Sequence, residues 1–122
     1  MAKVYSLRRK SVLALRQRKR TLLRSLQVKP DFLRGSFVER YGTCGKLNCA
    51  CRRGQKHGPF YYLTQCLAVG HVQKFLLKDG KRREQAKEGT AHYKQFCELL
   101  EELSQVNAEL LRRNQPITET RL

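Results

Sequence analysis

Two stretches of this chain place hydrophobic residues at helical spacing, three or four positions apart. The first covers residues 3–27, where an irregular apolar stripe runs among basic side chains until Pro30 ends it. The second covers residues 83–113 and ends before Pro116. The pattern predicts a basic N-terminal helix and a long C-terminal helix.

The second helical stretch also has the spacing of a heptad repeat. Its stripe comprises Tyr93, Phe96, Leu100, Leu103, Asn107 and Leu110. An asparagine in such a stripe sets the register of paired helices in a coiled coil. Residues 93–111 therefore predict one of two arrangements. They pair with a second copy or a larger protein, or they pack on the chain's own sheet and N-terminal helix.

Between the helices, aromatic and β-branched residues cluster in three segments, residues 36–41, 59–69 and 71–78. Together they predict an α+β fold, with a three-stranded antiparallel meander flanked in sequence by the two helices. A long connection joins the first two strands. The expected organisation is a basic helix at 1–30, the meander at 31–80, a helix at 81–114 and a disordered tail at 115–122.

Charge divides the chain into two unequal halves. The whole sequence has 26 Lys and Arg, 10 Asp and Glu, and a net charge of +16. Residues 1–60 hold 16 basic residues against Asp31 and Glu39, a net of +14, whereas residues 61–122 hold 10 basic and eight acidic residues, a net of +2. This excess predicts a nucleic acid as partner, and it places the interface in the first half.

The candidate contacts to nucleic acid are basic side chains of the first helix and of the long connection, with one tyrosine. They are Arg8, Arg9, Lys10, Arg16, Arg18, Lys19, Arg20, Arg24, Arg40, Lys46, Arg52, Arg53, Lys56 and Tyr61. The cations would hold phosphates, and an aromatic ring on a strand would stack on an unpaired base. Alternation sends Phe60 and Tyr62 to one face and Tyr61 to the other, so at least one of these three rings belongs to the core.

The connection between the first two strands contains a cluster of metal-ligating residues, which we call the knuckle (residues 44–57). Cys44, Cys49, Cys51 and His57 supply three sulfurs and an imidazole, a recurring ligand set for a structural zinc ion. Cys66, in the next strand, is the alternative fourth ligand. The odd cysteine count and the absence of a Cys-x-x-Cys pair weigh against disulfide or redox use. The knuckle therefore predicts a Zn²⁺ that clasps the connection.

Signatures of catalysis are weak. The basic half has no pair of carboxylates spaced for metal-ion nuclease chemistry, and the motifs of zinc deaminases and of nucleotide-binding loops do not occur. We therefore expect a protein that is not an enzyme.

The sequence contains no apolar run long enough to span a membrane, and its early apolar patch is too short for a secretory signal. With reduced cysteines, this predicts a cytoplasmic, nucleoid-associated protein without membrane contact. Residues 1–30 also have the composition of an organellar transit peptide, which is the alternative.

Three segments together resemble a short prokaryotic family that is known only as a domain of unknown function. They are residues 33–41, the Cys44-Gly45-Lys46 run with Cys49 and Cys51, and residues 54–63, which contain Lys-His-Gly-Pro-Phe-Tyr-Tyr-Leu. The resemblance covers roughly residues 33–113 and leaves out the basic N-terminal helix. It implies a prokaryotic origin and an association with transposases and other mobile-element genes, and it implies no activity.

We therefore expect a small zinc-binding, nucleic-acid-binding protein, accessory to a mobile-element or DNA-processing system. The association with mobile elements favours DNA over RNA. One alternative is an interaction subunit that docks a larger transposase or nuclease through its C-terminal helix. The other is a small RNA- or ribosome-associated protein.

Overall fold

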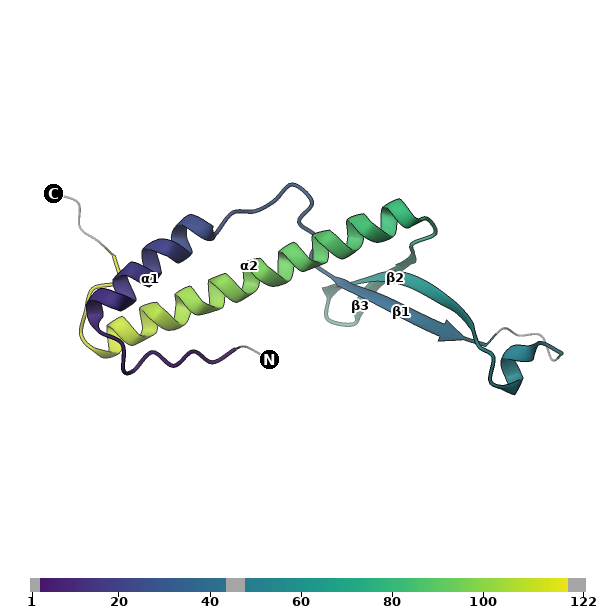
Figure 1. Cartoon of the computed structure of the whole chain (residues 1–122), viewed down its shortest axis with the longest axis horizontal. Coiled ribbons are helices and arrows are strands. Elements are labelled where there is room, and N and C mark those ends of the chain that lie inside the picture. The colour runs from purple at the N-terminus through teal and green to yellow at the C-terminus, as the bar shows by residue number, and fades with distance from the viewer. Residues whose placement is uncertain (1–2, 44–47, 119–122) are drawn as a thin grey trace. The chain divides into compact units, whose positions relative to one another are not determined.

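The computed structural model describes residues 3–43 and 48–118, with Cys51 and Arg52 described by their backbone alone. The elements in chain order are α1 (Val12–Ser25), β1 (Ser36–Gly42), the 3-10 helix η1 (Ala50–Arg53), β2 (His57–Ala68), β3 (His71–Leu76) and α2 (Gly80–Arg112) (Figure 1). Two helices and an antiparallel sheet in the order β1-β2-β3 confirm the predicted α+β class.

The chain forms two compact units. Unit 1 comprises residues 1–29 and 94–122, and unit 2 comprises residues 30–93. Helix α2 contributes its C-terminal part to unit 1 and its N-terminal part to unit 2. Neither described helix has the length of apolar sequence needed to cross a lipid bilayer.

The first helix is shorter than its apolar spacing predicts. It begins at Val12, not near residue 3, because Ser11 caps it: the Ser11 hydroxyl accepts a hydrogen bond from the Ala14 N–H at 3.1 Å. Residues 3–10 are not helical. Leu7 in this segment is still buried, so the apolar stripe reflects burial there, not helix.

The core of unit 1 forms where α1 packs along the C-terminal part of α2 (Figure 1). Leu15 and Leu22 of α1 and Val106 and Leu110 of α2 are fully buried. Leu100, expected in the heptad seam, remains 44% exposed. The C-terminal part of the helix thus packs Val106 and Leu110 on α1, and pairing through residues 93–111 stays a prediction.

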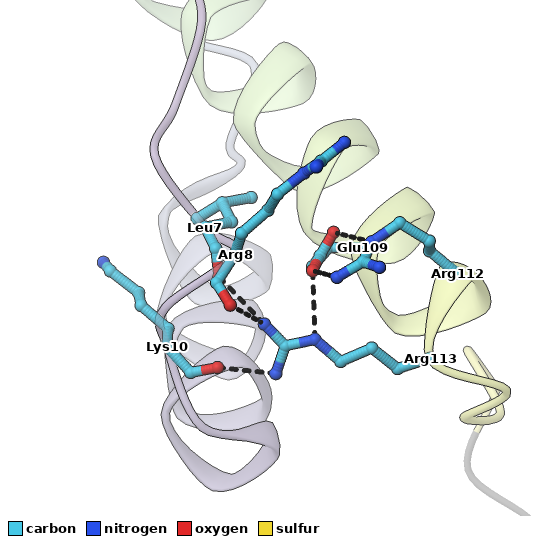
Figure 2. Close-up of polar contacts among 6 residues, drawn as sticks. All are labelled: Leu7, Arg8, Lys10, Glu109, Arg112 and Arg113. Carbon is cyan, nitrogen blue, oxygen red and sulfur yellow. Dashed lines mark hydrogen bonds and ion pairs between the residues drawn. The ribbon is translucent and has the colours of Figure 1, made fainter.

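Hydrogen bonds hold the N-terminal segment within unit 1: Gln105 of α2 bonds the backbone of Lys3 and Tyr5, and the Arg113 guanidinium bonds residues further along (Figure 2). Arg113 donates hydrogen bonds to the backbone carbonyls of Leu7, Arg8 and Lys10 at 3.0, 2.9 and 2.6 Å. Its Nε also donates to Glu109 at 3.0 Å. Because these bonds reach main-chain oxygens, they do not involve the side chains of Arg8 and Lys10.

Acid should weaken unit 1 through Glu109. Its hydrogen bond with Arg112, supported by Arg113, lowers the pKa of the carboxyl from 4.5 to about 2. A lowered pKa in the folded state means that the stabilisation is complete above pH 4.5 and is lost as the pH falls toward 2. We expect the free energy of unfolding, measured in urea at several pH values, to fall over this range.

Glu109→Gln is the matched control for this titration, because it removes the charge and keeps a side chain of similar size. Its stability should fall less steeply between pH 4.5 and 2 than that of the wild type. If the free energy of unfolding falls equally steeply with pH in both proteins, Glu109 is not the group responsible.

The chain after α2 continues the core of unit 1. Asn114 adopts a left-handed backbone (φ 59°), and the Gln115 N–H donates to the Leu110 carbonyl at 2.8 Å, which ends the helix. Ile117 then packs on the core, and Arg16 donates to the Pro116 carbonyl at 3.2 Å. These contacts involve the first part of the predicted tail, and residues 119–122 lie outside the described residues.

In unit 2, the N-terminal part of α2 covers one face of the sheet. The buried cluster consists of Leu63 of β2, Leu77 just after β3, and Ala86 of α2. Phe37 packs against it. The register pairs Phe37 with Leu63 and Leu63 with Phe75. Pairing is irregular after Arg40 and after Cys66.

A second contact in unit 2 forms where residues 31–33 cross α2 at Gly89, which is buried. The Leu33 N–H donates to the Gly89 carbonyl at 3.2 Å, and His92 Nδ1 lies 2.6 Å from the Asp31 carboxylate. A Cβ at position 89 would overlap the Asp31 carbonyl oxygen and lie 2.9 Å from Leu33 Cβ. Only glycine lets residues 31–33 cross the helix this closely.

We expect Gly89→Ala to lower the free energy of unfolding by about 2 kcal/mol, by overpacking the crossing. The direction of this change is informative, because at an uncrowded helix position alanine is more stable than glycine by about 1 kcal/mol. Gly80→Ala is the control, since a Cβ at Gly80 meets nothing within 4 Å. Urea denaturation measures the free energy of unfolding of both variants. An equal effect of the two substitutions would contradict the close packing of residues 31–33 on Gly89.

Candidate nucleic-acid interface

The structure brings together two of the four predicted zinc ligands. Cys49 Sγ lies 3.0 Å from His57 Nε2, with Cys49 just before η1 and His57 at the start of β2. Sulfur and nitrogen ligands on a tetrahedral zinc ion lie about 3.5 Å apart, given the usual bond lengths. The pair is therefore close to ligand spacing, and its soft sulfur and imidazole suit zinc.

The side chains of the other two predicted ligands, Cys44 and Cys51, are not described by the structure. Cys44 lies outside the described residues, and Cys51 is described only as backbone within η1. Among the described side chains, no three of His, Cys, Asp and Glu gather around one point. The four-ligand site remains a prediction that the Cys49–His57 contact supports.

Cys66, the alternative fourth ligand, lies far from this pair. It sits near the other end of β2, and its Sγ donates to the Ala68 carbonyl at 3.3 Å. At about 3.3 Å per residue, the strand separates His57 from Cys66 by roughly 30 Å. Cys66 cannot share an ion with Cys49 and His57.

The face of the sheet opposite the buried cluster of unit 2 carries exposed aromatic, aliphatic and basic side chains. We call it the open face; these members are Val38, Arg40, Phe60, Tyr62, Cys66, Val72, Lys74 and Leu76. Phe60, Val72 and Leu76 are 40%, 59% and 37% exposed. None of the described strand residues that point to this face is a carboxylate. The face is therefore apolar and positively charged.

A pocket of about 380 Å³ opens beside the Cys49–His57 pair. Its lining consists of Arg40, Tyr41, Gly42, Thr43, His57, Phe60 and Tyr62. The Tyr41 hydroxyl donates to the Glu39 carboxylate at 3.1 Å, and this bond raises the pKa of the Tyr41 phenol. The phenol therefore stays neutral at pH 7, and Arg40 brings a full positive charge to the lining.

Tyr61 lies on the covered face of the sheet, half-buried. Its ring stacks on Phe37 with a centroid distance of 5.5 Å, and the Arg83 guanidinium lies 4.8 Å above it. The ring therefore already has two partners within unit 2. Tyr62, its neighbour, points to the open face and has the Lys74 ammonium 4.3 Å from its ring centroid.

Several predicted phosphate contacts of α1 already have partners within unit 1. Arg18 forms a two-point ion pair with Glu102, with one bond of 2.8 Å, and this pairing lowers the pKa of the Glu102 carboxyl. Arg16 and Lys19 donate to the backbone carbonyls of Pro116 and Ile117. These three side chains contribute to folding.

The remaining predicted cations are exposed wherever the structure describes them. They are Arg8, Arg9, Lys10, Arg20 and Arg24 in unit 1 and Arg40, Arg53 and Lys56 in unit 2. Lys46 lies outside the described residues, and nothing is described of the Arg52 side chain. Each unit thus offers its own set of exposed positive charge.

Residues 12–66 match the family described as a domain of unknown function (DUF6788). The match confirms the resemblance to an uncharacterised domain family, and it spans α1, β1, η1 and most of β2. It includes the basic helix that the resemblance left out. No curated protein and no solved structure matches the chain.

The DUF6788 match contains the Cys49–His57 pair, Phe60 and Tyr62, but not Lys74. Lys74 was not among the predicted contacts, because β3 lies in the nearly neutral half of the chain. The signal for Tyr62 was strand alternation: Leu63 is the buried residue of β2, so its neighbour Tyr62 must face the other way.

Proposed function

We propose that this chain is a zinc-binding protein that binds nucleic acid, without enzymatic activity, and that DNA is its preferred partner. The supporting observation is the excess of exposed positive charge in a small fold. Such an excess attracts the phosphate backbone and releases its counterions.

The pairing of carboxylates strengthens this assignment. In unit 1, Glu102 is neutralised by Arg18, and Glu109 by Arg112 and Arg113. Arg18, Arg112 and Arg113 thus balance these two carboxylates, and Arg8, Arg9, Lys10 and Arg24 of the same unit are exposed. Their charge is directed to solvent, where a polyanion can contact it.

Zinc has a structural role in this proposal. Cys44, Cys49, Cys51 and His57 would hold the ion and pin the long connection between β1 and β2. A small unit gains folding free energy from such a staple. The clasped connection would present basic side chains to phosphates, namely Lys46, Arg52, Arg53 and Lys56.

The choice of DNA rests on the mobile-element association of the family that the sequence resembles. We infer an accessory role in a prokaryotic mobile-element or DNA-processing system. Binding to chromosomal DNA would place the protein in the nucleoid.

Fluorescence anisotropy tests this function. Protein freed of co-purifying nucleic acid is titrated into labelled duplex DNA and duplex RNA of the same sequence, at about 50 mM salt. We expect binding to both, with DNA bound more tightly. Binding to neither would refute the function, and tighter binding to RNA would select the RNA-associated alternative.

Two exposed leucines favour a second candidate function, docking to a larger protein through residues 93–111. Leu100 and Leu111 are 44% and 56% exposed and lie on one face of α2, about three turns apart. If docking is the main function, the chain alone should aggregate and a partner should relieve this. A purified chain that is monodisperse and binds DNA supports the first function.

A further inference from the structure

The two rings of the open face, exposed Phe60 and half-buried Tyr62, are placed to receive separate bases. Phe60 and Tyr62 are two positions apart on β2, so they point the same way about 6.6 Å apart. Phe60 is 40% exposed and lines the pocket with Tyr62. The spacing is about twice the 3.4 Å rise between stacked bases of a duplex strand.

Cations flank these rings on both neighbouring strands. Arg40 of β1 is the cross-strand partner of Phe60, and Lys74 of β3 lies over the Tyr62 ring at 4.3 Å. A strand running across the sheet would have a cation near its backbone on each side of the two rings. The absence of carboxylates among the described residues of this face removes the repulsion that phosphates would otherwise meet.

We propose that the open face binds an unpaired nucleic-acid strand, with two bases stacked on Phe60 and Tyr62 and their phosphates held by Arg40 and Lys74. This rests on the proposed function and adds to it an unpaired strand, bound at the open face, beside the duplex that the other exposed cations would hold. A base arriving at Tyr62 replaces the Lys74 ammonium on the ring, and the ammonium moves to the phosphate. Duplex DNA cannot use the rings in this way, because its bases are already stacked and paired.

Charge favours a nucleic acid over a protein on this face. A second copy of the chain would bring Arg40 and Lys74 against the same two cations, because a two-fold interface juxtaposes identical patches. Burying four like charges without a described carboxylate on the face is unfavourable. Phosphates supply the missing negative charge.

The test compares a single-stranded oligonucleotide with its duplex by anisotropy, for the wild type and three variants. Phe60→Leu and Tyr62→Leu keep an apolar side chain and remove the ring. Each should weaken single-strand binding at least about fivefold, since stacking contributes strongly per base. The loss should persist at high salt, and duplex binding should stay unchanged.

Phe75→Leu is the matched control. Phe75 is 45% exposed on β3, but its register with Leu63 places it on the opposite face of the sheet. It should leave single-strand binding unchanged. Thermal melts of all variants confirm that each is folded at the assay temperature.

The outcomes distinguish a failure of this inference from a failure of the proposed function. Binding of both nucleic acids with no effect of either ring substitution overturns the inference and leaves the proposed function standing. Binding of neither nucleic acid refutes both. A concentration-dependent dimer in sedimentation that Tyr62→Leu abolishes would assign the face to a second copy and overturn the inference.

Discussion

Raising the salt concentration from about 50 mM to about 200 mM is expected to weaken duplex DNA binding by about 10² to 10⁴-fold. The exposed candidate cations are Arg8, Arg9, Lys10, Arg24, Arg40, Arg53, Lys56 and Lys74. Each one that contacts a phosphate releases a counterion and adds about 0.9 to the slope of log K against log salt. Four to eight contacts give a slope of about −4 to −7.

The contribution of the unit 1 cations to this slope can be measured separately. Replacing Arg8, Arg9, Lys10 and Arg24 by alanine should reduce the magnitude of the slope by about 3 to 4. The fold should tolerate the change at positions 8 and 10, because Arg113 binds these residues through their backbone carbonyls (Figure 2).

The control removes the same amount of charge from the other half of the chain. Lys78, Lys81, Lys87 and Lys94 are exposed, and their replacement by alanine should leave the slope nearly unchanged. An equal fall in both quadruple variants would show that only net charge matters. A binding constant independent of salt would refute phosphate contacts altogether.

The second large effect concerns zinc. The purified protein is expected to hold zinc, and Cys49→Ser and His57→Ala should each lose most of it, because these side chains would supply adjacent ligands in the proposed site. Metal analysis measures the zinc, and Co²⁺ in its place gives thiolate absorption bands that report the sulfur ligands. Loss of the metal should also lower the melting temperature, since a structural zinc contributes folding free energy directly.

Cys66→Ser and Cys97→Ser are the controls for the zinc site. Cys66 lies at the far end of β2, and Cys97 lies in the part of α2 that belongs to unit 1. Both variants should keep the full zinc content. If Cys49→Ser and His57→Ala also keep it, the zinc assignment is wrong.

Local sequence signals located most elements correctly. The three strands and the long second helix follow from alternation and the helical period, because these patterns depend on neighbouring residues. The start of α1 was missed by about nine residues. The serine cap at residue 11 was visible in the sequence, but the apolar spacing that includes Leu7 suggested a longer helix.

The role of each side chain depended on partners distant in sequence. Arg18 was a candidate phosphate contact because it is basic, and only the structure shows that its guanidinium pairs with Glu102 of α2. Likewise, alternation separated Tyr61 from Tyr62, but it could not say which face α2 would cover. The heptad spacing could not distinguish an internal partner from a second copy, because both bury the same leucines.

By itself, the sequence determined the α+β class, the order of the elements, the excess of positive charge and the set of candidate zinc ligands. These properties depend on composition and on residues close together in the chain. The tertiary structure decided which cations are occupied in the fold, that His57 and not Cys66 meets Cys49, and that Phe60 and Tyr62 share an exposed face. Such outcomes depend on which residues fold against each other, and helical period or strand alternation carries no information about that choice.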